Sequence, residues 1–119
     1  MVVAMIKIEF GIIDKIDYTK DYCDYEPEKY NCICIDDDVY INDWWKRLAE
    51  MKTFFHKMDN PVKALARHGV TLIPPESLLI FIDIVTNDKR IHTDKHLVDL
   101  ANTIQEAIDA NKFMIHFGV

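Results

Sequence analysis

The chain has 119 residues, a length that suits one domain. Half of its residues are hydrophobic and 29% are charged, which is typical of a folded globular protein and excludes an intrinsically disordered one. The formal net charge is −6, and because a field of that sign repels phosphates, we expect no nucleic-acid partner and no membrane partner.

No apolar run approaches the roughly 20 residues that span a bilayer. The amino-terminal segment is interrupted by Lys7 and Glu9 and lacks the pattern of a secretory signal. We therefore expect a cytoplasmic protein whose three cysteines, Cys23, Cys32 and Cys34, are reduced.

The first third of the chain predicts two strands and a long connection between them. Apolar and polar residues alternate over residues 5–13, which predicts a strand with one apolar face. Residues 14–30 are acidic and rich in tyrosine and predict a connection. Residues 31–36 predict a second strand, with Cys32 and Cys34 on one face.

The middle of the chain predicts mainly helix. A capping residue at position 42 or 43, followed by apolar residues at helical spacing, predicts a helix that runs to about residue 58. Asn60 and Pro61 then predict the start of a short helix that stops at Gly69. Residues 70–73 predict a short strand or an extended link.

The last third predicts two helices and a strand. Two prolines and Glu76 predict a helix from about residue 74 to 86, although residues 78–85 also suit a buried strand. Thr93 or Asp94 caps the next helix, which Asn111 ends, and residues 112–119 predict a strand.

These elements predict one α+β domain over residues 1–119. We expect a small sheet, made of the amino-terminal strands and the carboxy-terminal strand, packed against about four helices.

The charge is concentrated in one segment. Residues 14–38 hold nine acids and three bases, a sum of −6, and the remaining eleven acids and eleven bases cancel. The same segment holds four of the five tyrosines. Carboxylates steer a basic protein toward the surface and tyrosine rings supply contact area, so the segment predicts a protein-binding surface. The alternative is a solvated loop whose tyrosines pack back over the core.

Adjacent tryptophans on a helix point in different directions, so we expect Trp44 in the core and Trp45 near the surface, where it suits binding. The predicted partner-binding residues are Tyr18, Asp21, Tyr22, Asp24, Tyr25, Glu26, Glu28, Asp36, Asp37, Asp38 and Trp45.

Three groups of residues have the types that bind metals, but each has a simpler explanation. His92 and His96 are four residues apart and suit a solvated helix start; the three cysteines suit small core residues; and Asp36 to Asp38 suit a solvated turn. The sequence has no glycine-rich phosphate loop and no Gly-x-Ser-x-Gly motif. We predict no metal and no cofactor, and no catalytic residue is identified.

The sequence therefore favours a small protein-binding module, in its specific form an immunity or inhibitor protein that neutralises a basic toxin or nuclease. Two alternatives stay open. One is a small enzyme that uses a His/Asp or Cys/His site. The other is a structural subunit of a homo-oligomer, in which residues 78–85 pack against a second copy.

Overall fold

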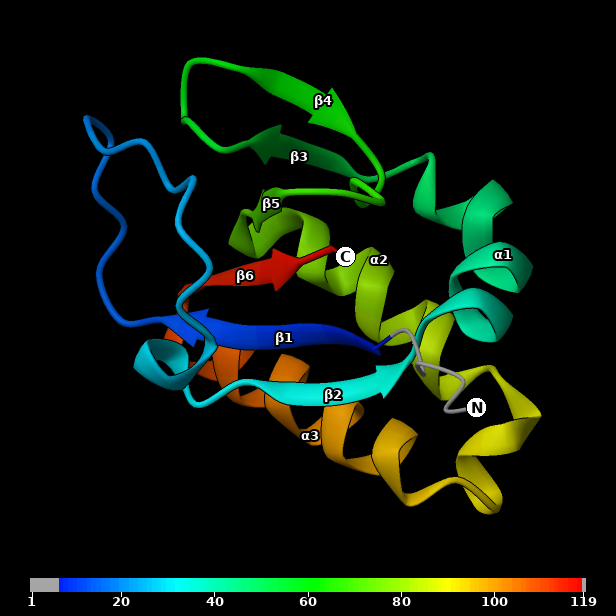
Figure 1. Cartoon of the computed structure of the whole chain (residues 1–119). Helices are drawn as coiled ribbons and strands as arrows, with labels where there is room; N and C mark the ends of the chain where they lie inside the picture. The colour runs from blue at the N-terminus through cyan, green and yellow to red at the C-terminus, as the bar shows by residue number, and fades with distance from the viewer. Residues whose placement is uncertain (1–6, 119) are drawn as a thin grey trace, which may run out of the picture.

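The computed structural model describes the backbone of residues 7–118 and the side chains of residues 8–35 and 40–118. Six strands form one antiparallel sheet in the order β2-β1-β6-β5-β3-β4 (Figure 1). The strands are β1 (Lys7–Ile13), β2 (Ile33–Asp36), β3 (Lys52–Phe55), β4 (Pro61–Lys63), β5 (Val70–Ile73) and β6 (Phe113–Phe117).

Helices cover one face of this sheet (Figure 1). They are α1 (Asp37–Leu48), α2 (Pro75–Thr86) and α3 (Lys95–Ala110), with the short 3-10 helix η2 (Lys89–His92). A second 3-10 helix, η1 (Pro27–Tyr30), lies in the connection between β1 and β2. The predicted α+β class is confirmed, with three α-helices in the described part of the chain where about four helices were expected.

The amino-terminal strands and the carboxy-terminal strand lie in one sheet, which confirms the prediction. β1 lies between β2 and β6, and Phe10 is paired with Ile33 on one side and with His116 on the other. β1 was expected to begin at residue 5, but residues 5 and 6 lie outside the described residues. The sheet is larger than expected because β3, β4 and β5 extend it beyond β6.

The prediction of one helix over residues 42–58 is wrong. α1 begins directly after β2 and ends at Leu48, and residues 52–55 form β3. In β3, Thr53 is buried and Lys52 is exposed. β-Branched and aromatic residues suit a strand, and the helical spacing of Met51 and Phe55 is a coincidence.

The short helix predicted from residue 60 is also wrong. Pro61 instead opens the edge strand β4, a position where proline is tolerated because no ladder hydrogen bond needs its missing N–H group. Ala64 has a φ of 65°, a left-handed value that interrupts an α-helix. Gly69, just before β5, has a φ of 87°. The segment is therefore a hairpin strand and a loop.

Residues 78–85 belong to α2, so the helical prediction is confirmed and the strand alternative is wrong. Leu78, Phe81, Ile84 and Val85 are buried in the core of this chain, whereas Leu79 is exposed. The buried side of α2 therefore packs within this chain, and the homo-oligomer built on this segment stays a prediction.

The start and end of α3 follow the predicted signals. The Asp94 carboxylate accepts the His96 backbone N–H at 2.9 Å, which caps the helix, and Asn111 ends it with a left-handed φ of 55°.

The expected burial of Trp44 is confirmed, and its indole N–H joins a polar network between α1 and η2. The indole donates to Asp88 at 2.8 Å, and Arg90 donates to the same carboxylate at 2.6 Å. Hydrogen bonds from Arg90 hold the pKa of Asp88 well below its usual range. Arg90 also pairs with Asp43 on α1 at 2.9 Å, so the network ties the two segments together.

The second face of the sheet is covered by the connection between β1 and β2. A second apolar cluster lies there, with sheet residues from β1, β5 and β6 and Tyr22 from the connection. Gly11 makes this close approach possible, because a Cβ atom at that position would lie 2.7 Å from Cys32 Sγ and from Tyr30 Cβ.

Candidate functional site

The connection of residues 14–30 is held on the sheet by Tyr22. Its side chain is 4% exposed, and its backbone N–H donates to the His56 carbonyl at 2.8 Å. Its hydroxyl accepts the Asp17 backbone N–H, also at 2.8 Å. Figure 1 shows the connection leaving the end of β1, reaching toward the turn between β3 and β4, and returning to η1. Tyr22 is therefore an anchor of this segment.

The other tyrosines of the connection contact phenylalanine rings of the sheet, Tyr18 and Tyr25 in edge geometry and Tyr30 with tilted rings. Tyr25 and Tyr30 lie against Phe117, with ring centroids 5.4 and 6.1 Å away, and Tyr18 lies against Phe113 at 6.4 Å. Tyr18 and Tyr25 nevertheless remain 67% and 65% exposed. Each of the two interpretations therefore applies to different tyrosines. Tyr22 packs on the core, whereas Tyr18 and Tyr25 remain open to solvent.

Tyr25 covers a carboxylate that projects from the sheet. Its hydroxyl donates to Glu9 Oε1, and this hydrogen bond, with burial second, raises the pKa of Tyr25 to about 12. The other oxygen, Glu9 Oε2, is buried and has no hydrogen-bond partner among the described residues. A buried acceptor of this kind is normally hydrogen-bonded, to the protein or to an ordered water molecule.

The acids of the connection differ in their partners. Asp21 faces Lys57 at 3.8 Å and His56 at 3.9 Å, and Glu26 faces Lys29 at 3.6 Å. Within the part of the chain that the structure describes, Asp24 and Glu28 are exposed and make no ion pair. These two carboxylates beside Tyr25 are thus available to a cationic partner.

The structure brings together only part of the predicted partner-binding set. The expectation for Tyr22 fails because its side chain is buried. The side chains of Asp36, Asp37 and Asp38 lie outside the described residues. Trp45 lies on α1, is 39% exposed, and stacks 4.9 Å from the Arg67 guanidinium group.

Cys23 and Cys32 are free thiols. Burial first, and then the nearby Glu9 carboxylate, raise the pKa of Cys32 to about 12, which disfavours the thiolate that a nucleophile or a metal ligand needs. Cys23 is exposed, and desolvation and neighbouring acids raise the pKa of its thiol as well. Both environments oppose cysteine chemistry.

The two histidines four residues apart are both exposed, His92 at the end of η2 and His96 in the first turn of α3. Among the described residues, no group of three or more His, Cys, Asp or Glu side chains is arranged to hold a metal ion.

Two other histidines are buried or partly buried. His116 is 1% exposed and burial lowers its pKa to about 4, so it is neutral at pH 7; its Nε2 lies 3.2 Å from the Ala66 carbonyl. His56 pairs with Asp21, but it lines neither of the two large clefts of the described surface. Neither residue supplies the His/Asp site of the enzymatic alternative in a cavity that could hold a substrate.

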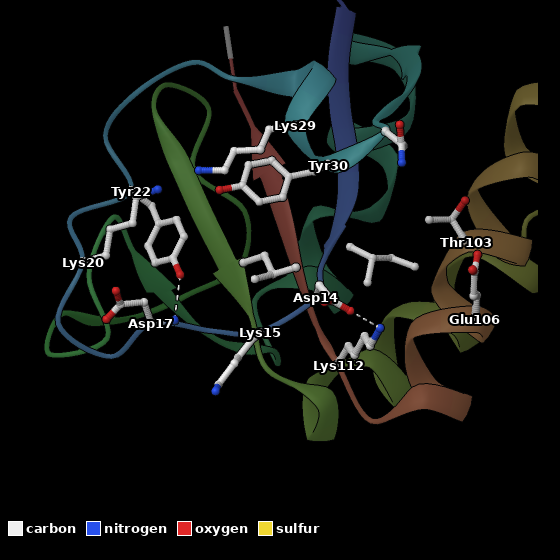
Figure 2. A pocket seen from close by; sticks show the side chains of 13 residues that line it. Asp14, Lys15, Asp17, Lys20, Tyr22, Lys29, Tyr30, Thr103, Glu106 and Lys112 are labelled. Atoms are coloured by element: carbon white, nitrogen blue, oxygen red, sulfur yellow. Dashed lines mark hydrogen bonds and ion pairs between the residues drawn. The ribbon is translucent and has the colours of Figure 1, made fainter.

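A cleft that the sequence analysis missed lies at the end of β1 (Figure 2). It has a volume of about 720 Å³, and all three lysines of the acidic segment, Lys15, Lys20 and Lys29, line it together with Lys112. The negative net charge of residues 14–38 gave no indication that these lysines lie together. The only available signal was the presence of the three lysines themselves, because their convergence depends on how the connection folds.

Comparison of the chain with protein-family models, with curated proteins and with solved structures found no match. A search of the described residues found no helix with the length and apolar character needed to cross a membrane.

Proposed function

We propose that this protein is a binding module for a basic protein, and that the contact is made by the outward side of the connection between β1 and β2. We call this surface the acidic face and define it by Asp21, Asp24, Tyr25, Glu26 and Glu28. The proposal rests on the observation that buried Tyr22 anchors the connection, while Tyr25 and its neighbouring acids remain at the surface.

Anchoring matters because ordering a loop upon binding costs free energy. The hydrogen bonds of Tyr22 to His56 and Asp17, and the packing of Tyr25 on Phe117, already order this segment. A partner therefore meets a surface whose conformation is largely prepared.

The charges suit a cationic partner in two ways. The field of the acidic segment attracts a basic protein from a distance and speeds the encounter. At contact, Asp24 and Glu28 accept charge-assisted hydrogen bonds from lysine or arginine. Tyr25 contributes a large, fairly rigid ring at low entropic cost.

The specific form that we favour is an inhibitor or immunity protein that blocks a basic toxin or nuclease. Exposed carboxylates on a rigid loop imitate the phosphates that such a target binds. The small size of the chain and its concentrated negative charge support this form of the proposal.

The test is a pull-down from the native source at low and moderate salt, with the intact chain as bait. The variant Asp24→Lys/Glu28→Lys reverses two charges of the acidic face. The matched control Asp59→Lys/Asp109→Lys makes the same charge change at two exposed acids elsewhere.

We expect a basic protein that elutes as salt rises, that the control still captures, and that the acidic-face variant loses. Equal capture by both variants would show that net charge or another surface is responsible, and would overturn the proposal.

A further inference from the structure

A second cleft, of about 820 Å³, adjoins the cleft at the end of β1. The two share four lining residues, Ile13, Asp14, Lys15 and Lys112, and we call the two adjoining clefts together the groove. The ion pair between Asp14 and Lys112, at 2.5 Å, marks the place where they join (Figure 2). Each part has the size of a typical small-molecule site.

The second cleft is the apolar end of the groove. Tyr18 from the connection, Met58 from the turn after β3, and Leu79 from α2 line it from three separate segments. Leu79 is 62% exposed, and with Tyr18 it belongs to the few large apolar side chains that the described residues leave open to solvent. Covering these side chains with an apolar group is favourable.

The first cleft is the basic end. Lys20 lies 4.9 Å from the Tyr22 ring and Lys29 lies 5.9 Å from the Tyr30 ring. Figure 2 shows both lysine side chains ending beside these rings, and both lysines line this cleft. An anion bound at this end can accept charge-assisted hydrogen bonds from the two ammonium groups.

The acids of the first cleft have partners or lie across from the lysines, and Asp17 also interacts electrostatically with Lys20. Asp14 is paired with Lys112, and Asp17 accepts the Thr19 backbone N–H and hydroxyl at 2.9 and 2.7 Å. Glu106 lies on α3, across the cleft from Lys20 (Figure 2). Glu26 reaches Lys29 at 3.6 Å, but both side chains are about half exposed, so this pair is weak.

We propose that the groove binds a small amphipathic organic anion, with a carboxylate head between Lys20 and Lys29 and an apolar tail over Tyr18 and Leu79. The positively charged end and the apolar end match the two parts of such a ligand. The net charge of −6 favours a free small molecule over an anionic membrane, because the acidic segment repels a bilayer of like charge. This site adjoins the acidic face through the Glu26–Lys29 pair, but it does not depend on the proposed protein partner.

The experiment is a calorimetric titration of the intact protein with decanoate, below the concentration at which it forms micelles. Acetate supplies the head alone, and decyltrimethylammonium supplies the tail with the opposite charge. We expect decanoate to bind one to one, and both other probes to bind at least about tenfold more weakly, as expected when a charge-assisted contact or the apolar contact is lost.

Variants locate the two ends. Lys20→Gln/Lys29→Gln should weaken decanoate about tenfold or more, whereas Lys63→Gln/Lys95→Gln, which removes two exposed lysines outside the groove, should leave it unchanged. Leu79→Ser should weaken decanoate without changing the response to acetate. Lys20 is half-buried and the other substituted positions are exposed, and near-ultraviolet circular dichroism checks that each variant is folded.

Three results would overturn the proposal: equal binding of decanoate and decyltrimethylammonium, binding that survives Lys20→Gln/Lys29→Gln, or several decanoate molecules per chain. Co-sedimentation with vesicles of anionic phospholipid, without one-to-one binding of decanoate, would assign the groove to a membrane surface instead.

Discussion

Replacing Tyr22 by alanine tests whether the connection is built onto the sheet. An aromatic side chain buries about 150 Å² or more, and at roughly 25 cal/mol per Å² this corresponds to about 4 kcal/mol. Tyr22 is nearly fully buried, and its hydroxyl accepts the Asp17 N–H. Since truncation also leaves a cavity, we expect Tyr22→Ala to lower the free energy of unfolding by about 3–5 kcal/mol.

Tyr18→Ala is the matched control, because the same atoms are removed from a ring that is two-thirds exposed. We expect it to cost less than about 1 kcal/mol, since little surface returns to water. Urea denaturation followed by tryptophan fluorescence measures both values, and the dependence on urea shows whether the connection still unfolds with the sheet. Similar losses for the two variants would refute the anchoring role of Tyr22.

The remaining predictions concern titration and charge. The pKa of His116 is lowered to about 4 in the folded protein. Between about pH 6.5 and 4 the unfolded chain therefore binds a proton at this residue, whereas the folded chain does not. Unfolding free energy should therefore fall as pH drops from about 6.5 toward 4, by up to about 3 kcal/mol, and urea titrations should show a flatter profile for His116→Gln. Asp88→Asn should cost about 1.5–3 kcal/mol, because it removes the charged acceptor of Arg90 and Trp44. Asp83→Asn breaks an exposed pair with Arg47 and should cost less than about 1 kcal/mol in the same assay. Alkylation at pH 8, followed by peptide mass spectrometry, should modify exposed Cys23 well before Cys32; preferential labelling of Cys32 would contradict the burial described for it.

The elements that could be predicted are those in which pattern and boundary signals agree. β1 alternates apolar and polar residues, β6 is a short apolar run after Asn111, and α3 has both a capping Asp94 and a terminating Asn111. β3 and β4 have only four and three residues, too few for a period-2 pattern to be distinguished from helical spacing. Their pairing is a tertiary interaction, and that interaction overrides the weak local signals.

The candidate site shows the same division. The concentration of acids and tyrosines is a property of composition, so it could be read from the sequence. Which tyrosine is buried depends on the path of the connection across the sheet, and this path is set by contacts such as Tyr22 with His56. The meeting of Lys20 and Lys29 at one cleft has the same cause.

Amide hydrogen exchange of the intact protein tests the central claim, that the connection is an ordered surface, most directly. The Asp17 and Tyr22 amides are hydrogen-bonded to the Tyr22 hydroxyl and the His56 carbonyl, so we expect both to be protected. Asp24, at the exposed part of the acidic face, should exchange rapidly. Exchange of Asp17 and Tyr22 at the rate of an unstructured peptide would contradict the account, because the acidic face would then have no fixed shape to offer a partner.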